Sequence, residues 1–272
     1  LSVLRARRVN AENRKRMIFR SLRRLMATNA VRHHDLHAFL QQPATANQSL
    51  VVLNSESCGA PLLEKLWDAS DYVCCADGGA NRAHDLLGAD RAPDAVVGDL
   101  DSARADVLAA YEKNGCAVHR VEDQDANDLS KALAHVGRRW DAAGVSDGVV
   151  RVAGAFGDRF DHELAAVDAL YRFGAQRPKA RCVLHGDRTA AMLLGAGAHE
   201  IRVRRDVEGP HCGLIPVGGA VRRVTTTGLT WNLSGQRLAF GELVSSSNLL
   251  RDDIVSIETS DPVLWTVEVR IT

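Results

Sequence analysis

The sequence predicts an α/β domain built on a parallel sheet, followed by an all-β, sandwich-like C-terminal domain. Between residues 49 and 178, short apolar runs alternate with segments of helical spacing, a pattern typical of a parallel sheet with helices packed on its faces. Between residues 179 and 272, short β-rich segments follow one another with turn residues between them, which is typical of an antiparallel sandwich or barrel. We therefore expect two folded domains, 49–178 and 179–272.

In the first predicted domain the expected strands are short apolar runs. They are 49–54, 72–76, 95–97, 117–121 and 149–153. The expected helices are 61–69, 80–87, 104–113, 128–139 and 161–173. Acidic and glycine-rich segments follow the strands at their carboxyl ends, which is where open α/β sheets bind ligands.

The second predicted domain consists of short strands, several of which alternate between apolar and polar residues. They are 181–184, 189–194, 199–203, 211–216, 220–226, 241–245, 254–259 and 263–271. Alternation with a period of two indicates strands with one buried and one exposed face.

Residues 1–48 are predicted to be a basic, disordered leader that precedes the fold. The first 25 residues contain nine Arg or Lys residues and one acid, Glu12. Three interpretations remain open, namely a mitochondrial-type presequence, a patch that contacts RNA or membrane, and a disordered extension; we favour the last. We expect a cytoplasmic protein, with mitochondrial targeting by this basic segment as the alternative.

The overall composition excludes several classes of partner. Hydrophobic residues make up 46% and charged residues 25% of the chain, and the formal net charge is zero, so no nucleic-acid partner is expected. No apolar run approaches the ~18 residues of a membrane span, so no membrane partner is expected either. The six cysteines contain no CxxC pair and are expected to be free thiols of a reducing compartment.

The first candidate ligand segment follows the second expected strand and contains Asp77, Gly78, Gly79, Asn81 and Arg82. Paired glycines let backbone N–H groups approach a phosphate, and the helix that follows favours an anion at its N-terminus. Asp77 would repel that anion unless it bonds a hydroxyl group, a base edge or a metal ion. A tight turn with a helix cap explains this segment equally well.

The second candidate segment follows the third expected strand and contains two carboxylates two residues apart, Asp99 and Asp101. Two carboxylates so close together repel each other unless a cation lies between them, and Mg²⁺ commonly takes one or two carboxylates plus substrate phosphates. The alternative is that one aspartate caps a helix that begins near Ser102. We favour the metal site.

The third and fourth candidate segments add charged groups to the same edge of the sheet. Residues 122–131 contain Asp128 and, one helical turn later, Lys131, which lies near enough to meet a phosphate; a solvated acidic loop with a helix cap is the alternative. Residues 154–162 contain Arg159, which could grip a phosphate with two hydrogen bonds. Asp161 and His162 are neighbours in sequence and do not face each other on a helix, so no proton relay between them is expected.

Taken together, these segments resemble the thiamin pyrophosphokinases of the eukaryotic type, and the resemblance extends from Leu50 to Thr272. The motifs ADGGANR, GDLDS, DQDANDLSKAL and Gly157–Asp161 occur in the order and spacing of that family. In the C-terminal domain the segments TTTGLTWNL, FG, LVSSSN and PVLWT also resemble the family. Any one motif is weak, but this many in order are hard to obtain by chance.

The resemblance implies transfer of a pyrophosphoryl group from ATP to the hydroxyethyl oxygen of thiamine, giving thiamine diphosphate and AMP, with Mg²⁺ as cofactor. It also implies an ATP-binding α/β domain, a thiamine-binding β-sandwich and a homodimer with active sites between the subunits. By position, Asp99, Asp101 and Asp128 would hold Mg²⁺, with Asp77 and Asp161 as supporting acids. The groups implied around ATP are Asp77, Gly78, Gly79, Asn81, Arg82, Lys131, Arg159 and Asp161.

Thiamine would meet Gln124, Trp231, Ser247 and Asn248 by the same resemblance, with Trp231 reaching in from the partner subunit. An indole face suits a flat cation such as thiamine, with a cation–π attraction of about 1–2 kcal/mol when desolvated. Two alternatives remain open: pyrophosphoryl transfer to another heterocyclic alcohol, and a thiamine- or nucleotide-binding protein without turnover.

The chain departs from the family pattern at three positions. Asn127 stands where a Thr is usual, Asp158 where a Gly is usual, and His162 where Gln is common in animal relatives. Asn127 can still cap the helix that follows it. Asp158 is the departure that puts activity in question, because it adds a negative charge beside an expected phosphate site.

Overall fold

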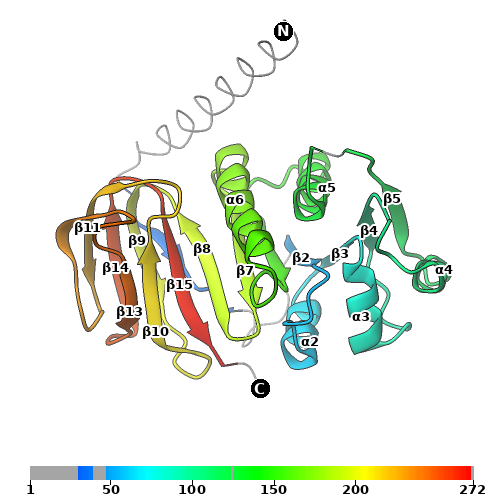
Figure 1. Ribbon diagram of the computed structural model, residues 1–272, viewed down its shortest axis with the longest axis horizontal. Helices are drawn as coiled ribbons and strands as arrows, with labels where there is room; N and C mark the ends of the chain where they lie inside the picture. The colour runs from blue at the N-terminus through cyan, green and yellow to red at the C-terminus, as the bar shows by residue number, and fades with distance from the viewer. Residues whose placement is uncertain (1–29, 39–46, 124, 271–272) are drawn as a thin grey trace, which may run out of the picture.

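The structure, a computed structural model, describes residues 30–38, 47–123 and 125–270. An α/β half and a β-sandwich half lie at opposite ends of an elongated molecule, and one ten-stranded sheet runs through both (Figure 1). The strand order in that sheet is β13-β10-β15-β8-β7-β6-β2-β3-β4-β5. Its strands are β2 (Gln48–Val52), β3 (Tyr72–Ala76), β4 (Ala95–Gly98), β5 (Ala117–Arg120), β6 (Val149–Ala153), β7 (Arg181–Gly186), β8 (Thr189–Leu194), β10 (Glu208–Ile215), β13 (Ser245–Leu249) and β15 (Val263–Val269).

The shared sheet changes from parallel to antiparallel between β7 and β8. Every pairing from β5 through β4, β3, β2 and β6 to β7 is parallel. The pairings from β7 through β8, β15 and β10 to β13 are antiparallel. The predicted order of an α/β part followed by a β-rich part is therefore confirmed.

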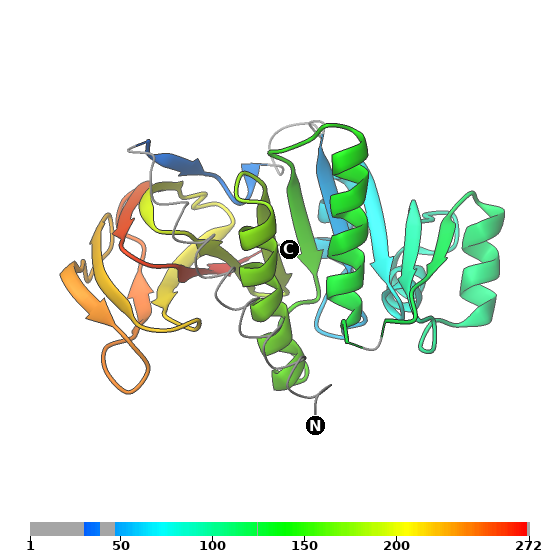
Figure 2. The ribbon, with the colours of Figure 1, turned by 90° about the horizontal axis from the view of Figure 1, so that it is seen from above.

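Helices cover both faces of the parallel half. They are α2 (Ala60–Asp68), α3 (Gly79–Leu87), α4 (Ala105–Lys113), α5 (Asp128–Ala142) and α6 (Phe160–Gln176). Because alternate residues of a strand point to opposite faces, Leu50 and Val52 of β2 pack with α2, α3 and α4, whereas Val51 packs with α5 and α6. Figure 2 shows α5 and α6 side by side in front of the sheet. Burial on both faces explains why these strands are continuous apolar runs.

A second sheet of five strands packs on the antiparallel half of the first and completes a β-sandwich. Its order is β1-β9-β14-β11-β12. Its strands are β1 (Arg32–His34), β9 (Gly197–Arg202), β11 (Val221–Thr227), β12 (Ser234–Leu238) and β14 (Ile254–Thr259). Apolar residues of β8, β10 and β15 meet those of β9, β11 and β14 in one buried cluster. The predicted sandwich is confirmed.

Part of the predicted leader belongs to the fold. β1 pairs in parallel with β9, Leu36 is 3% exposed within the sandwich core, and Asp35 forms an ion pair with Arg204 at 2.9 Å. The prediction of disorder is therefore wrong for residues 30–38, whose partners lie some 165 residues later in the chain. Residues 1–29 and 39–46 lie outside the described residues.

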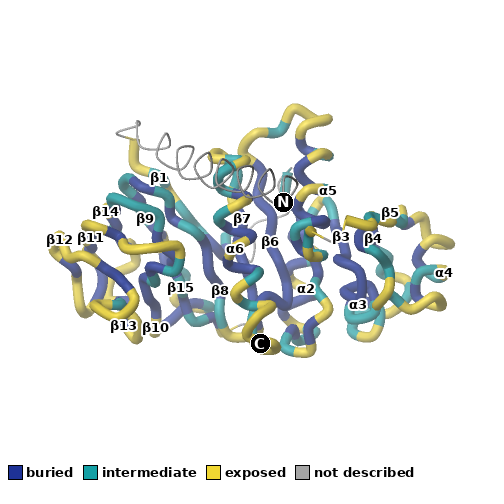
Figure 3. Tube along the Cα trace, turned by 45° about the horizontal axis from the view of Figure 1, so that its top comes forward, coloured by how far each residue is buried: buried dark blue, intermediate teal, exposed yellow. Residues whose placement is uncertain are grey.

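Two other expectations about the β-rich half differ from the structure. β12 was not predicted, and the strand expected at 241–245 lies instead at Ser245–Leu249. Both strands are polar, and β12 is exposed along most of its length (Figure 3), so neither has the apolar signal from which the other strands were predicted. The parallel part also extends to β7, one strand beyond the expected boundary at residue 178.

Candidate active site

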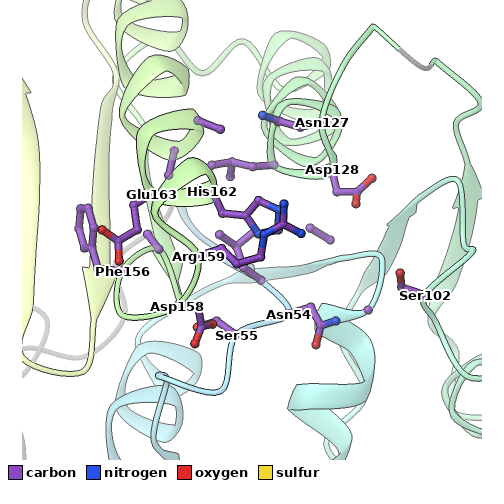
Figure 4. Close-up of a pocket in the computed structure, with 18 residues that line it drawn as sticks. Asn54, Ser55, Ser102, Asn127, Asp128, Phe156, Asp158, Arg159, His162 and Glu163 are labelled. Carbon is purple, nitrogen blue, oxygen red and sulfur yellow. The ribbon is translucent and has the colours of Figure 1, made fainter. Parts of the chain in front are cut away.

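A cleft lies at the carboxyl ends of the parallel strands, beside β2. At this strand the order of the sheet switches from one side to the other. From β2 the chain proceeds through β3, β4 and β5 on one side, and it returns on the other side of β2 through β6 and β7. The loops after β2 and β6 therefore diverge, and open α/β sheets bind ligands between such loops. A cavity of about 230 Å³ lies there (Figure 4). Its polar lining residues are Asn54, Ser55, Ser102, Asn127, Asp128, Asp158, Arg159, His162 and Glu163.

Three carboxylates gather at the end of the cleft, each from a different strand-to-helix connection. Asp77 follows β3, Asp99 follows β4, and Asp128 is the first residue of α5, after β5. One oxygen atom of each carboxylate lies within 4.8 Å of the others. Parallel strands end at the same edge of a sheet, so three neighbouring loops bring together residues that are far apart in sequence. Carboxylate oxygens in this number suit a hard divalent cation such as Mg²⁺.

Asp77 is the most strained member of this cluster. It is 1% exposed, and neither of its carboxylate oxygens has a hydrogen-bond partner within the described part of the chain. Its backbone φ is 44°, a left-handed conformation that residues other than Gly rarely adopt. Burial and the negative charges around it raise the pKa of Asp77 to about 6. A cation at the cluster would satisfy these oxygens, so the residues present fit a divalent metal ion.

Lys131 lies one turn into α5 and points back into the cluster. Its Nζ is 3.0 Å from Asp99 Oδ2 and 3.2 Å from Asp128 Oδ1, and its side chain is 3% exposed. Burial alone would lower the pKa of Lys131, but its hydrogen bonds to Asp99 and Asp128 outweigh burial and raise it. The hydrogen bond from Lys131 is also the main reason that the pKa of Asp99 is lowered.

Asp101, the remaining predicted metal ligand, is not part of the carboxylate cluster. Its side chain is exposed and accepts a hydrogen bond from Ser102 Oγ at 2.9 Å. The alternative interpretation of this segment as a helix cap is wrong, because α4 begins at Ala105 and its N-cap is Arg104, which makes no side-chain cap.

Packing requires Gly79 of the first candidate segment and leaves little room beside Gly78. A Cβ on Gly79 would lie 2.1 Å from the carbonyl oxygen of Val52, and one on Gly78 would lie 2.6 Å from Asn54 Nδ2. Only glycine therefore lets α3 begin this close to β2. The segment forms the predicted turn into α3, although Gly78, the N-cap, makes no side-chain cap.

Asn81 and Arg82 use their side chains to hold the loops that surround the cleft. Asn81 Nδ2 donates to Ser102 O at 2.8 Å and Asn81 Oδ1 accepts from the backbone N–H of Arg104 at 2.8 Å. Arg82 donates to the carbonyl oxygens of Glu56 and Cys58 at 2.9 and 2.8 Å. In the structure both residues fix the loops after β2 and β4.

The segment after β6 contributes charged groups to the cleft. Figure 4 shows Arg159 and His162 at the start of α6, projecting into the space between that helix and Asp128. Arg159 pairs with Asp161 through two hydrogen bonds of 3.1 and 2.6 Å, and both side chains are largely exposed. Asp158, where the family usually has Gly, lines the cleft.

The sequence did not single out Asn54, Ser55 or Glu163 as site residues. Asn54 and Ser55 directly follow β2, on one side of the switch point, and line the cleft. Glu163 Oε1 accepts a hydrogen bond from the backbone N–H of Gly157 at 2.8 Å and so fixes the loop after β6. Placement at a strand end was the available signal for Asn54 and Ser55.

The predicted helix cap at the start of α5 is confirmed, because the side chain of Asn127 accepts a hydrogen bond from the backbone N–H of Ser130 at 2.8 Å.

The residues predicted to meet thiamine lie in the sandwich, apart from the cleft. Trp231 is 59% exposed in the connection between β11 and β12. Ser247 and Asn248 are in β13, where Ser247 has a φ of 56°. These strands and α5 lie in different halves of the molecule (Figure 1). Gln124 lies outside the described residues.

A three-carboxylate cluster beside a cleft at the switch point of a parallel sheet defines the class: an α/β protein with a candidate metal site next to a candidate nucleotide site. Two family models match the chain: "Thiamin pyrophosphokinase, catalytic domain" at residues 63–184 and "Thiamin pyrophosphokinase, vitamin B1 binding domain" at residues 198–264. The protein belongs to the thiamin pyrophosphokinase family.

Similar proteins support this family assignment over most of the chain. Thiamine pyrophosphokinase 1 of Oryza sativa subsp. japonica is 39% identical, over 84% of this chain and 89% of its own. Thiamine pyrophosphokinase 1 of Arabidopsis thaliana is 38% identical, over 82% of this chain and 87% of its own. The crystal structure of yeast thiamin pyrophosphokinase shares the fold with a TM-score of 0.79 at 21% identity, covering 89% of this chain and 92% of its own. No helix among the described residues is long and apolar enough to cross a membrane.

Proposed function

We propose that this protein is a thiamine diphosphokinase, which transfers the pyrophosphoryl group of ATP to thiamine and releases AMP. The proposal is supported by the plant relatives of that name and by one structural observation, the cluster of Asp77, Asp99 and Asp128 beside the cleft. In the reaction the hydroxyl oxygen of thiamine forms a bond to the β-phosphorus, and the bond between that phosphorus and the oxygen bridging to the α-phosphorus breaks. The hydroxyl proton passes to a base, and AMP leaves.

The cofactor is inferred to be Mg²⁺, held by Asp77, Asp99 and Asp128. When bound, the metal ion would neutralise charge on the phosphates. Asp101 stays a predicted ligand, although its carboxylate is engaged by Ser102. Arg159 lines the cleft and Lys131 lies in the carboxylate cluster beside it, and we assign both cations to phosphate oxygens. This transfer depends on positioning and charge neutralisation more than on covalent chemistry by the protein.

Thiamine binding is assigned to the sandwich of a second copy of the chain. Trp231 exposes a flat aromatic face to which a cationic ring can stack. It follows β11, however, which lies in the sandwich half, whereas β3, β4 and α5, which position the carboxylates, lie in the α/β half (Figure 1). One small molecule can contact both if two chains pack antiparallel about a twofold axis, with the sandwich of each chain against the cleft of the other. The exposed apolar residues Phe160, beside the cleft, and Phe240, in the sandwich, are 71% and 65% exposed and suit such an interface.

Product analysis tests the activity. Purified protein with ATP, Mg²⁺ and thiamine should form AMP and thiamine diphosphate in equal amounts, and both should require all three components. Formation of ADP alone would contradict the proposal. A panel of other heterocyclic alcohols measures acceptor choice, and thiamine binding without any product would indicate the non-catalytic alternative that Asp158 raises.

Complementation tests the shared site. Trp231→Ala and Asp99→Asn should each abolish most activity, but a mixture exchanged after mild dissociation should regain about a quarter of the sites, because half of the dimers are mixed and each contains one intact site. No recovery despite proven subunit exchange would place Trp231 and Asp99 outside a common site.

As for location, six free, buried cysteines support our proposal of a reducing compartment such as the cytoplasm.

A further inference from the structure

The ammonium group of Lys131 occupies the space between two of the three clustered carboxylates. It contacts Asp99 at 3.0 Å and Asp128 at 3.2 Å. The lysine side chain is 3% exposed, whereas those of Asp99 and Asp128 are 24% and 42% exposed. The positive charge therefore approaches the cluster from the protein side, and both carboxylates keep a side open to the cleft.

A divalent cation would neutralise the cluster better than Lys131 does. Asp77, Asp99 and Asp128 together contribute three negative charges when ionised; Lys131 neutralises one of them, whereas a divalent cation in its place would neutralise two. Lys131 also leaves Asp77 unsatisfied, because neither oxygen of that carboxylate has a hydrogen bond within the described residues. An ammonium group has three donors and a compact charge, yet here it meets only two of the three acids.

We propose that Lys131 is a resident cation that the metal ion displaces from Asp99 and Asp128, and that the released ammonium group then binds the phosphates of the nucleotide. This inference rests on the proposed function and extends it. Asp99 Oδ2 and Asp128 Oδ1, the oxygens that accept from Lys131, belong to the same carboxylates that would bind the metal ion. A metal ion that coordinates these two oxygens competes with the ammonium group for their lone pairs, so its binding would displace the ammonium group.

The lysine side chain is suited to this exchange. Its Cα is fixed in α5, one turn after Asp128, while its flexible four-carbon stem lets the ammonium group shift without moving the helix. The cleft beside it is where we place the triphosphate, whose negative charge compensates the displaced ammonium group. Metal ion and nucleotide then favour each other's binding, and this coupling is reciprocal.

Metal binding without nucleotide separates this exchange from simpler roles. Calorimetric titration with Mn²⁺ should show that Lys131→Met binds the ion on the order of tenfold more tightly than the wild type, a typical coupling strength between linked sites. A lysine that only braces the carboxylates predicts weaker binding in the variant, and one that only contacts phosphate predicts no change. Either result would overturn the exchange. Lys113→Met, at the exposed end of α4, is the matched control and should leave Mn²⁺ affinity unchanged.

The coupling gives a second measurement. In the wild type, the non-transferable analogue α,β-methylene-ATP should tighten Mn²⁺ binding, and in Lys131→Met this enhancement should shrink by a similar factor. Lys131→Arg retains the charge and should bind Mn²⁺ alone less tightly than Lys131→Met. Equal enhancement in wild type and Lys131→Met would contradict a part for the lysine in the coupling.

The wild-type protein offers a readout that needs no variant. The buried ammonium group of Lys131 should give a protected ¹⁵N-ammonium NMR signal in metal-free protein, and Mg²⁺ should shift or abolish that signal. A signal that persists unchanged at saturating Mg²⁺ overturns the proposal. None of these measurements uses thiamine. A chain that makes thiamine diphosphate but shows no exchange therefore keeps the proposed function, whereas one that binds no divalent ion in any variant loses the metal site itself.

Discussion

The side-chain amide of Asn248 holds the peptide groups on both sides of Trp231. Asn248 Oδ1 accepts from the backbone N–H of Trp231 at 3.1 Å, and Asn248 Nδ2 donates to the carbonyl oxygen of Trp231 at 2.8 Å. Asn248 is 3% exposed, whereas Trp231 is 59% exposed. The asparagine therefore fixes the backbone of the β11–β12 connection and leaves the indole ring free to meet a ligand.

This geometry predicts that Asn248 acts on thiamine through Trp231. Asn248→Ala removes the four hydrogen bonds of this side chain, two of them to Trp231 and worth about 1 kcal/mol each, so the KM for thiamine should rise on the order of tenfold while the KM for ATP stays unchanged. Tryptophan fluorescence of the variant should show a more mobile indole. Ser246→Ala, at an exposed position of the same strand, is the control. An unchanged KM for thiamine would remove Asn248 from the thiamine site.

A second prediction concerns the orphaned carboxylate of Asp77. Asp77→Asn removes a buried negative charge beside two others and keeps a residue that tolerates the left-handed backbone. The metal-free variant should gain about 1–2 kcal/mol of stability, measured by urea unfolding in EDTA, while its Mn²⁺ affinity falls at least tenfold. Asp90→Asn, which is exposed, should change neither quantity. A variant that is less stable and binds Mn²⁺ normally would show that Asp77 is a structural residue.

The third prediction tests the close approach of α3 to β2. Gly79→Ala would place a methyl group 2.1 Å from a backbone oxygen of Val52, and a shift of the helix should cost about 2–3 kcal/mol or more. Gly174→Ala in α6 meets nothing closer than 3.8 Å and should instead stabilise the protein by about 0.5–1 kcal/mol, because alanine favours helix. Thermal unfolding of both variants is the measurement, and a harmless Gly79→Ala would show that the helix can shift at little cost.

Much of the fold and of the site edge could be predicted because their signals are local. Apolar runs followed by Asp77 and Asp99 mark strand ends directly, and these ends must share one edge of a parallel sheet. Which carboxylates converge could not be predicted, since Asp101 lies two residues from Asp99 yet stays outside the cluster that Asp77 joins. The left-handed φ of Asp77 and of Leu100, 44° and 65°, sets the directions in which the neighbouring carboxylates point. Neither Asp nor Leu as a residue type indicates a left-handed backbone, so the sequence does not show it.

The docking of residues 30–38 could not be predicted for a different reason. β1 is three residues long, and its partner β9 lies far away in sequence, so local periodicity holds no information about the pairing.

The fourth prediction concerns the packing of this segment on the sandwich. Leu36→Ala should destabilise the protein by about 2–5 kcal/mol, as for other buried leucines, because Leu36 lies in the sandwich core.

Val31→Ala is the matched control for that variant, since Val31 lies in the same segment but is 42% exposed. Its free energy of unfolding should stay within about 0.5 kcal/mol of the wild type, as for most surface substitutions. Equal effects of the two substitutions, by urea or thermal unfolding, would mean that the segment does not pack on the sandwich in solution.

The last prediction concerns pH and the histidine pair that joins β1 to β9. His199 Nε2 bonds the carbonyl oxygen of Gly195 at 2.7 Å, so this nitrogen carries the proton. In neutral His199 the other nitrogen must accept, and His34 Nε2–H donates to it at 3.0 Å. Burial is the main reason that the pKa falls to about 3 for His34 and about 4 for His199.

An unfolded chain takes up protons at both histidines near pH 6.5, whereas the folded chain resists until about pH 4. Stability is therefore fully present above pH 6.5 and is lost as the pH falls toward these folded values. Between pH 7 and pH 5, each histidine should lower the free energy of unfolding by about 1–2 kcal/mol. His34→Gln should reduce the loss measured by urea unfolding, and His162→Gln, at an exposed position, should not. Identical pH profiles for wild type and His34→Gln would mean that His34 titrates normally in the folded protein.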